Sequence, residues 1–156
     1  MNVVIMVGCS GSGKSHYVWE QVRSLGPDTR CSAVSADNYF LSDEGVYNFD
    51  VSKLGEAHAS CVREFVDLCQ SIGYDKVFVD NTNTTTEEIA PYYALAKAYG
   101  HTVTVVVVLA PPETCVRANQ HGVPEHAIRG QETRLSKLTF PPFWEIAVQT
   151  VVNERR

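Results

Sequence analysis

The sequence lacks the features of a secreted, disulfide-linked or membrane-spanning protein. Its five cysteines are an odd number without a C-x-x-C spacing, which disfavours both a disulfide framework and a zinc site. A strand-like run follows Met1 directly, without a basic leader segment. The longest apolar run, residues 103–110, is too short to cross a bilayer. These absences predict a cytoplasmic protein with reduced thiols.

An excess of basic residues is also missing. The formal net charge of −5 argues against a protein that coats nucleic acid through a general basic surface. A polyanionic substrate must therefore be held by a few well-placed cations. The 156 residues suffice for one domain with its own core, and they contain no repeat, linker or low-complexity tract. We expect a single domain over residues 1–156.

Residues 8–15, Gly-Cys-Ser-Gly-Ser-Gly-Lys-Ser, form a complete G-x-x-x-x-G-K-S motif. An apolar run of strand length precedes it and a helical pattern follows, which is the context that this phosphate-binding loop requires. Backbone amides and the start of the helix would hold phosphate oxygens, Lys14 would lie near the β- and γ-phosphates, and Ser15 would ligate magnesium. The motif predicts ATP and Mg²⁺ as cofactors, with a nucleotide site formed by Gly8, Ser10, Gly11, Ser12, Gly13, Lys14 and Ser15.

Strand-like and helical patterns alternate along the whole chain. Strands are expected at 3–7, 31–35, 76–80, 102–109 and 146–152. Helices are expected at 16–22, 51–72, 84–99, 113–120 and 124–137. Leu54, Cys61, Phe65, Leu68 and Ile72 share one face of the second helix, and Pro91 should kink or restart the third. The alternation predicts a three-layer α/β/α fold around a parallel five-stranded sheet.

Two aspartates follow predicted strands. In parallel α/β sheets ligands bind where strands end, and Asp37 and Asp80 end the second and third strands. Asp80 closes a hydrophobic strand as Walker-B acids do, so we assign it, with Ser15, to the magnesium ion. Asp37 is then the candidate base for an acceptor hydroxyl. The structural alternative for either aspartate is a helix cap or turn residue.

A basic segment late in the chain predicts a helical lid over residues 113–137. Its side chains flank the hinge-like Gly-Val-Pro at 122–124 and would close over the triphosphate. We assign two arginines to the charge of the transferring group and one to ATP. The alternative is a solvated face, because glutamates alternate with the arginines. The two catalytic candidates are Arg117 and Arg134, the ATP-binding candidate is Arg129, and His121 is a further possible cation.

Two other groups of side chains keep two interpretations each. Asn81 and Asn83 either bond the acceptor or pack the loop after the third strand. Four aromatic residues either offer a stacking platform for a base or form a satellite core under their loop. These aromatic residues are Tyr39, Phe40, Tyr47 and Phe49.

Five blocks over residues 1–134 resemble the polynucleotide 5′-hydroxyl kinase branch of the P-loop phosphotransferases. The more specific blocks are Ser-Ala-Asp-Asn-Tyr-Phe at 35–40 and Val-Asp-Asn-Thr-Asn at 79–83. The others are the loop at 8–15, Leu54 with Ala57 and His58, and Asn-Gln-His-Gly-Val-Pro at 119–124. The resemblance implies a P-loop kinase fold, a role in nucleic acid repair, Asp37 as general base and Asp80 as the acid of the third strand. The sequence departs from the family at Ala118, where arginine is usual and Arg117 lies one place earlier, and from the family's phage member near Phe40, where that enzyme has an arginine beside the base.

These features predict a kinase that transfers the γ-phosphate of ATP to the 5′-hydroxyl end of DNA or RNA. One alternative is a kinase of a small metabolite or nucleoside, and another is a nucleotide-binding module without catalysis. A cyclic phosphodiesterase is excluded, because it needs two His-x-Ser/Thr motifs and the chain has only His58-Ala59-Ser60.

Overall fold

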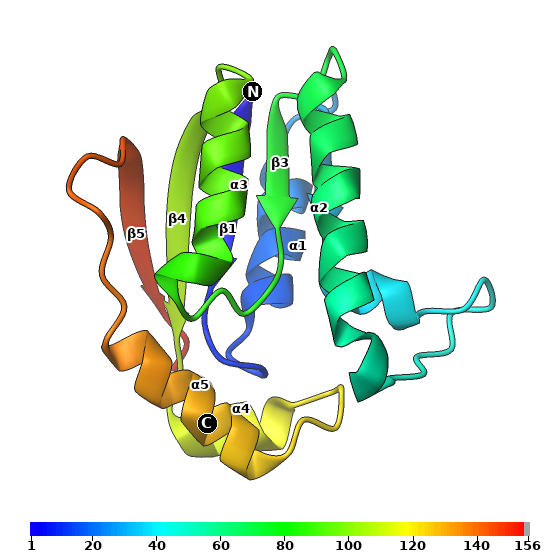
Figure 1. The fold of residues 1–156 in the computed structure, drawn as a ribbon, viewed down its shortest axis with the longest axis vertical. Helices are drawn as coiled ribbons and strands as arrows, with labels where there is room; N and C mark the ends of the chain where they lie inside the picture. Colours follow the sequence, from blue (N-terminus) through cyan, green and yellow to red (C-terminus); the bar gives the residue numbers. More distant parts are fainter. Residues whose placement is uncertain (155–156) are drawn as a thin grey trace.

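The structure, a computed structural model, describes residues 1–154 and contains a parallel five-stranded sheet of order β2-β3-β1-β4-β5. The strands are β1 (Asn2–Val7), β2 (Cys31–Val34), β3 (Lys76–Val79), β4 (Thr102–Leu109) and β5 (Ile146–Val152). The main helices are α1 (Lys14–Ser24), α2 (Leu54–Gln70), α3 (Thr86–Ala98), α4 (Pro112–Ala118) and α5 (Glu125–Ser136). In Figure 1, α2 and α3 lie in front of the sheet and α1 behind it. The predicted three-layer α/β/α fold is confirmed.

The central strand β1 is buried on both faces, as its continuous apolar sequence predicts. Val3, Ile5 and Val7 pack with residues of α2 and α3. Val4 and Met6 pack with α1 on the other face. Packing on both faces holds β1 in place, and so it positions the loop that follows the carboxyl end of this strand.

The second predicted helix is shorter than expected, and its predicted apolar face is only partly correct: Cys61 and Phe65 are buried, whereas Leu54 is 40% exposed. Val51–Lys53 forms a 3₁₀ turn, η2, whose N-cap Asp50 accepts a hydrogen bond from the Ser52 amide at 2.9 Å. Ile72 lies beyond the end of α2 and is 95% exposed, so its assignment to the apolar face is wrong. Three of the four buried side chains, which recur at every fourth residue, are small and let α2 approach the sheet closely, and Phe65 is the large one. The buried face consists of Ala57, Cys61, Phe65 and Cys69.

A capping box starts α3, as the Thr85-x-x-Glu88 spacing in the sequence predicts. The Thr85 side chain accepts from the Glu88 amide, and the Glu88 side chain accepts from the Thr85 amide. The helix continues through Pro91, so the predicted restart does not occur. Pro91 is exposed and removes one backbone donor, a loss that the capping box and the buried Ile89 outweigh.

The four carboxyl ends of β1, β2, β3 and β4 point toward α4 and α5 (Figure 1). β1 leads into the glycine loop, β2 into the 3₁₀ helix η1 (Ala36–Phe40), and β3 into Asp80. Within the described residues, every cysteine is a free thiol, and no helix has the length and apolarity needed to cross a membrane.

Candidate active site

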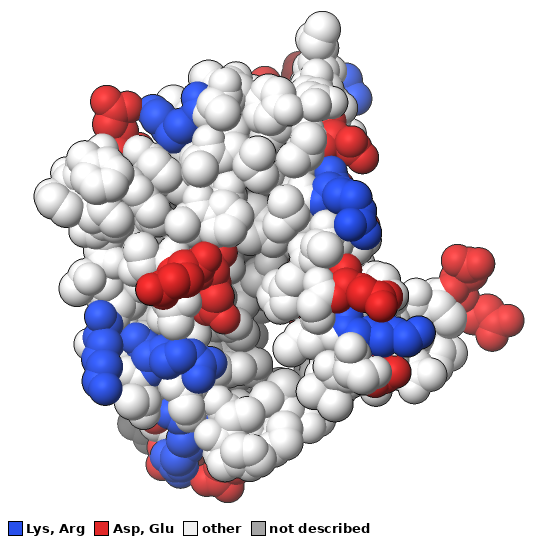
Figure 2. All heavy atoms as spheres, viewed as in Figure 1, with Lys and Arg blue, Asp and Glu red and all other residues white. Residues whose placement is uncertain are grey.

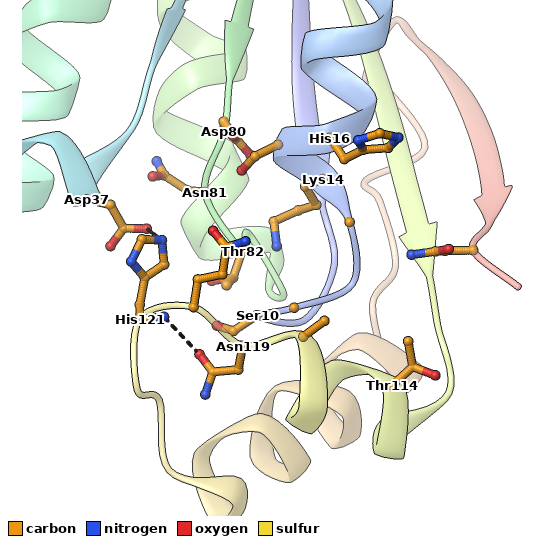
Figure 3. A pocket seen from close by; sticks show the side chains of 16 residues that line it. Ser10, Lys14, His16, Asp37, Asp80, Asn81, Thr82, Thr114, Asn119 and His121 are labelled. Carbon is orange, nitrogen blue, oxygen red and sulfur yellow. Dashed lines mark hydrogen bonds and ion pairs between the residues drawn. The ribbon is translucent and has the colours of Figure 1, made fainter. Parts of the chain in front are cut away.

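A pocket of about 330 Å³ lies at the carboxyl end of the sheet. It is bounded by the glycine loop, the ends of β2 and β3, and the turn after α4 (Figure 3). Asp37 and His121 lie at one side of it, Thr114 lies at the other, and Lys14 and Ser10 lie between them. The lining residues are Ser10, Gly11, Gly13, Lys14, Ser15, His16, Asp37, Asp80, Asn81, Thr82, Thr114, Ala118, Asn119, Gln120, His121 and Asn153.

Glycines of the loop lie where a side chain would be crowded, and Gly11 and Gly13 also have a positive φ. Gly11 has a φ of 78°, and a Cβ there would overlap the carbonyl oxygen of Cys115 in α4. Gly13 has a φ of 101°, and a Cβ there would lie 2.7 Å from the side-chain nitrogen of Asn153. That nitrogen donates to the Ser12 carbonyl at 2.9 Å. The loop is therefore clamped between α4 and the end of β5.

Lys14 is buried beneath the loop that carries it. Its Nζ donates to the carbonyl oxygens of Gly8 at 3.0 Å and Cys9 at 2.9 Å. Burial lowers the pKa of Lys14, and the negative charge of Asp80 opposes that change. The ammonium group thus lies inside the pocket, close to the amides that the motif provides for phosphate.

Asp80 lies behind Ser15 with one oxygen that has no partner. Its Oδ1 is fully buried and makes no hydrogen bond within the described residues, although the Ser15 side chain bonds the carboxyl group. Burial raises the pKa of Asp80. An orphaned carboxylate oxygen next to a hydroxyl fits Mg²⁺, which binds hard oxygen ligands and usually takes one or two carboxylates together with substrate phosphates. The residues present therefore fit the predicted magnesium ion.

Asp37 is held by two side chains from other segments. The Tyr47 hydroxyl donates to Oδ1 at 3.2 Å, and Nε2 of His121 lies 3.6 Å from Oδ2. The carboxyl side chain remains 49% exposed, and it lines the pocket. Burial and the charge of Asp37 raise the pKa of Tyr47 to about 12, so the hydroxyl stays a donor even at pH values above 10. The N-cap of η1 is Ser35 and not Asp37.

Asn81 and Asn83 hold the chain in place, which is the packing interpretation of the two that the sequence allows. Asn81 accepts from the Ala36 amide at 2.8 Å and donates to the Tyr92 hydroxyl at 3.2 Å. Asn83 has a φ of 46° and donates to the Met6 carbonyl at 2.8 Å. Both side chains are buried, although Asn81 also borders the pocket.

The three predicted lid arginines lie outside the pocket lining. Arg117 is exposed on α4. Arg129 pairs with Glu125 at 3.0 Å and approaches Glu113 at 3.9 Å. Nε of Arg134 donates to the Thr84 hydroxyl at 3.1 Å. Their predicted action on phosphate stays a prediction.

The segment predicted as a lid touches the glycine loop through a residue that sequence analysis missed. The side chain of Gln131 in α5 accepts from the Ser10 amide at 2.8 Å and donates to the Ser10 hydroxyl at 3.1 Å. α4 ends at Ala118, and the side chain of the next residue, Asn119, donates to the Val123 carbonyl at 2.6 Å. Amide side chains carry little sequence signal, because they are common on solvated helix faces.

Tyr47 and His121 were also missed as partners of Asp37. The sequence shows Tyr47 among the loop aromatics and His121 in the predicted lid, but neither pattern indicates that they meet. Their rings lie 4.5 Å apart, and both contact Asp37. Only the packing of the loop that carries Tyr47 against the turn after α4 brings them together.

Comparison with known proteins assigns the chain to a family. The AAA domain model AAA_33 matches residues 3–137. NEDD4-binding protein 2 of Homo sapiens is 32% identical over 139 residues, which are 81% of this chain and 7% of that protein. The chain thus spans a small part of that relative.

Solved structures share the fold, and two of them match over most of this chain. A chain of the Pnkp1/Rnl/Hen1 RNA repair complex is 19% identical with a TM-score of 0.69, covering 92% of this chain and 48% of that one. The Mycobacterium tuberculosis APS kinase CysC, in complex with AMPPNP and APS, is 18% identical with a TM-score of 0.58, covering 99% and 90%. The match over residues 3–137, together with this shared P-loop kinase-like fold, shows that the chain belongs to the AAA domain family AAA_33.

Proposed function

We propose that this protein is an ATP-dependent phosphotransferase that moves the γ-phosphate to the 5′-hydroxyl end of DNA or RNA. The observation that carries the proposal is that Lys14, Asp80 and Asp37 line one pocket. A cation, a metal-binding carboxylate and a second carboxylate are the groups that phosphoryl transfer to a hydroxyl requires.

The phosphate groups lie along the glycine loop in this proposal. Lys14 contributes positive charge at the β- and γ-phosphates, and the start of α1 contributes its dipole. Ser15 and Asp80 hold Mg²⁺, which neutralises charge on the phosphate oxygens when it is bound. The buried Oδ1 of Asp80 supports this assignment, because a cation would satisfy it.

Asp37 is the proposed general base. The acceptor oxygen attacks the γ-phosphorus in line, the bond from that phosphorus to the bridging oxygen breaks, and ADP leaves. The hydroxyl proton passes to the Asp37 carboxylate. Tyr47 fixes the orientation of the carboxylate through its hydrogen bond to Oδ1, and this leaves Oδ2 toward the turn that carries His121.

Among the lid arginines, we propose Arg117 as the main contact to the transferring phosphate. It precedes Ala118, which lines the pocket, and no hydrogen bond or ion pair of the described residues engages its side chain. Arg129 and Arg134 must first leave Glu125 and Thr84 to reach a phosphate. Their assigned roles, on ATP and on the transferring group, apply to a lid that has moved closer.

Two observations bear on the acceptor. The sequence blocks around Asp37 and Asp80, and the likeness to a chain of an RNA repair complex, favour a polynucleotide end. A small-molecule kinase is the second candidate, because an APS kinase shares the fold and Lys14 is the only Lys or Arg among the described lining residues. A third possibility, nucleotide binding without transfer, gives no product with any acceptor.

The test is an acceptor panel with ATP labelled at the γ-phosphate and Mg²⁺ present. It contains 5′-hydroxyl DNA and RNA oligonucleotides, single and double stranded, together with free nucleosides and small hydroxyl compounds. We expect label at the 5′ end of at least one oligonucleotide. Label only on a small compound replaces the proposal with the second candidate. ATP binding without any labelled product favours the non-catalytic module.

A further inference from the structure

Three rings form a row that starts at Asp37 and leads away from the pocket. The ring of His121, which approaches Asp37, lies 4.5 Å from the ring of Tyr47. The Tyr47 ring is stacked within 12° of the Phe49 ring, with centroids 6.5 Å apart. We call His121, Tyr47 and Phe49 the ring row. Tyr47 and Phe49 lie on the same side of their extended segment, because alternate residues face the same way.

The ring row rests on an ordered support. Residues 41 and 47 pair as an antiparallel bridge, and the turn between them is closed by hydrogen bonds from the Val46 amide to the Ser42 hydroxyl and from the Ser42 amide to the Val46 carbonyl. Phe40 is buried beneath, with its ring 6.1 Å from Tyr47 and 5.0 Å from Phe49 in edge contacts. The satellite core expected from the sequence therefore exists, and it holds the ring row in place.

The outer end of the ring row is exposed. Phe49 is 48% exposed and Tyr39 is 38% exposed, next to further exposed apolar side chains of the same segment. Aromatic surface of this extent beside a polar pocket suits a flat ligand that has one apolar face and one polar edge. A nucleobase has this chemistry.

Basic side chains do not explain how an acceptor would be held beside Asp37. The pocket lining contains Lys14 and no arginine within the described residues. On the face shown in Figure 2, Lys and Arg form small separate groups among acidic residues, without a continuous basic surface. An acceptor beside Asp37 must therefore gain most of its affinity from contacts other than phosphate pairing. Stacking supplies such affinity, at about 5- to 100-fold per base.

We propose that the terminal base of the acceptor stacks on the ring row and so places its own 5′-hydroxyl at Asp37. The inference rests on the proposed function and specifies its substrate as a nucleoside end whose terminal base has one face free to stack. A base and its 5′-hydroxyl belong to the same nucleoside, so a base near His121 leaves the hydroxyl within reach of Asp37.

The test compares Phe49→Ala and Phe49→Leu with Val46→Ala. Leucine keeps apolar bulk but removes the ring, and Val46, 59% exposed on the same turn, is the matched control outside the ring row. The acceptors are a single-stranded 5′-hydroxyl oligonucleotide, the same strand with an abasic terminal nucleotide, and the free terminal nucleoside. Circular dichroism and thermal unfolding verify that each variant is folded.

Both Phe49 variants should raise KM for the base-terminated strand by about 5- to 100-fold, with kcat nearly unchanged. They should not change KM for the abasic strand, and Val46→Ala should change neither. Equal effects on both strands, or none, would overturn the inference while leaving the kinase assignment intact. If the Phe49 variants raise KM for the free nucleoside as much as for the base-terminated strand, the base alone is recognised. If they raise KM only for the strand, the base is recognised together with the backbone of the strand. Either response supports the inference.

A binding measurement keeps the inference testable if no acceptor is phosphorylated. Asp37→Asn is mixed with a strand that carries 2-aminopurine at its 5′ end, and fluorescence quenching reports stacking. We expect the Asp37→Asn protein to quench the fluorescence and the double variant Asp37→Asn/Phe49→Leu not to quench it. Quenching without phosphorylation by the wild type would reject the proposed function and retain the base site. Unquenched fluorescence at saturating protein would reject the base site.

Discussion

The side-chain carbonyl of Asn81 accepts a hydrogen bond from the backbone amide of Ala36 at 2.8 Å. This bond connects the end of β3 to the residue before Asp37. The other end of the Asn81 amide donates to the Tyr92 hydroxyl at 3.2 Å. One buried side chain thus sets the position of the proposed base relative to the strand that ends in Asp80.

Replacing Asn81 by Ala should lower both stability and turnover. The Ala36 amide would lose its partner inside the protein, which costs about 1–3 kcal/mol of unfolding free energy. Asp37 would also lose its fixed position, so kcat should fall at temperatures where the variant is fully folded. Tyr92→Phe is the control, because it keeps the bond to Ala36. It should lose stability without losing kcat, and a matching loss of kcat would contradict the positioning role.

Gly11→Ala should disrupt the site far more than Gly45→Ala. Both glycines have a φ of 78°, so both substitutions carry a similar backbone cost of about 1–2 kcal/mol. A Cβ at Gly11 also overlaps the Cys115 carbonyl, whereas a Cβ at Gly45 meets nothing within 4 Å. Urea unfolding measures the stability of the two variants, and ATP titration measures their nucleotide affinity. The difference between the variants reports the packing of α4 against the loop. Equal losses of stability and affinity would show that this contact is unimportant.

Asp37→Asn should lower turnover by about 10²–10⁴-fold, the usual contribution of a positioned general base. Asparagine keeps the size of the side chain but cannot accept the proton. ATP affinity should hardly change, because the glycine loop and Lys14 are untouched. Single-turnover assays and equilibrium ATP titration measure the two quantities. A variant with wild-type turnover would remove Asp37 from the mechanism.

Asp80→Asn should stabilise the protein in EDTA and inactivate it in Mg²⁺. Burial raises the pKa of Asp80, so the folded state holds a proton more tightly than the unfolded state does. The stability of the wild type must therefore fall as pH rises from the unfolded value of about 4 through the folded one. At neutral pH, the neutral amide avoids that cost, a gain on the order of 1 kcal/mol. Denaturant unfolding with and without Mg²⁺ measures both effects, and a less stable variant in EDTA would be evidence against this account.

Tyr47→Phe should change stability at alkaline pH. The pKa of Tyr47 rises from 10.0 to about 12 in the folded protein, mainly through burial and the charge of Asp37. The folded state then keeps its proton longer than the unfolded state, so stability is lost as pH increases from 10 to 12. The variant lacks this group, and its stability curve should be flatter over that interval. Asp37→Asn should flatten the curve partly, because burial persists. Identical curves for all three proteins would contradict the Tyr47–Asp37 interaction.

Local patterns predicted the fold well. The glycine loop, the alternation of apolar and helical segments, and the Thr85–Glu88 box are each short-range, and the structure confirms all three elements. Ile72 failed because an apolar residue after the last turn satisfies helical spacing without being helical. Periodicity shows which residues share a face, but not where the helix stops.

The candidate site was only partly predictable. Lys14, Asp37 and Asp80 meet because parallel strands end at one edge of the sheet, a rule that sequence order is enough to apply. The contacts of Asp37 with His121 and of Ser10 with Gln131 depend on how α4 and α5 are oriented. Arginines on exposed helix faces look alike in sequence, whether they point to a phosphate or to a neighbouring glutamate, as Arg129 does.

In the proposed site, the Ser10 amide can bond either a phosphate oxygen or the Gln131 side chain, which accepts from it at 2.8 Å, but not both. A phosphate oxygen that takes this amide must displace the glutamine, and α5 then loses one of its ties to the loop. Because such linkage is reciprocal, anything that pulls α5 away favours the phosphate by the same free energy. The Gln131 side chain would thus compete with phosphate for the Ser10 amide, and its release on phosphate binding would loosen the attachment of α5 to the loop.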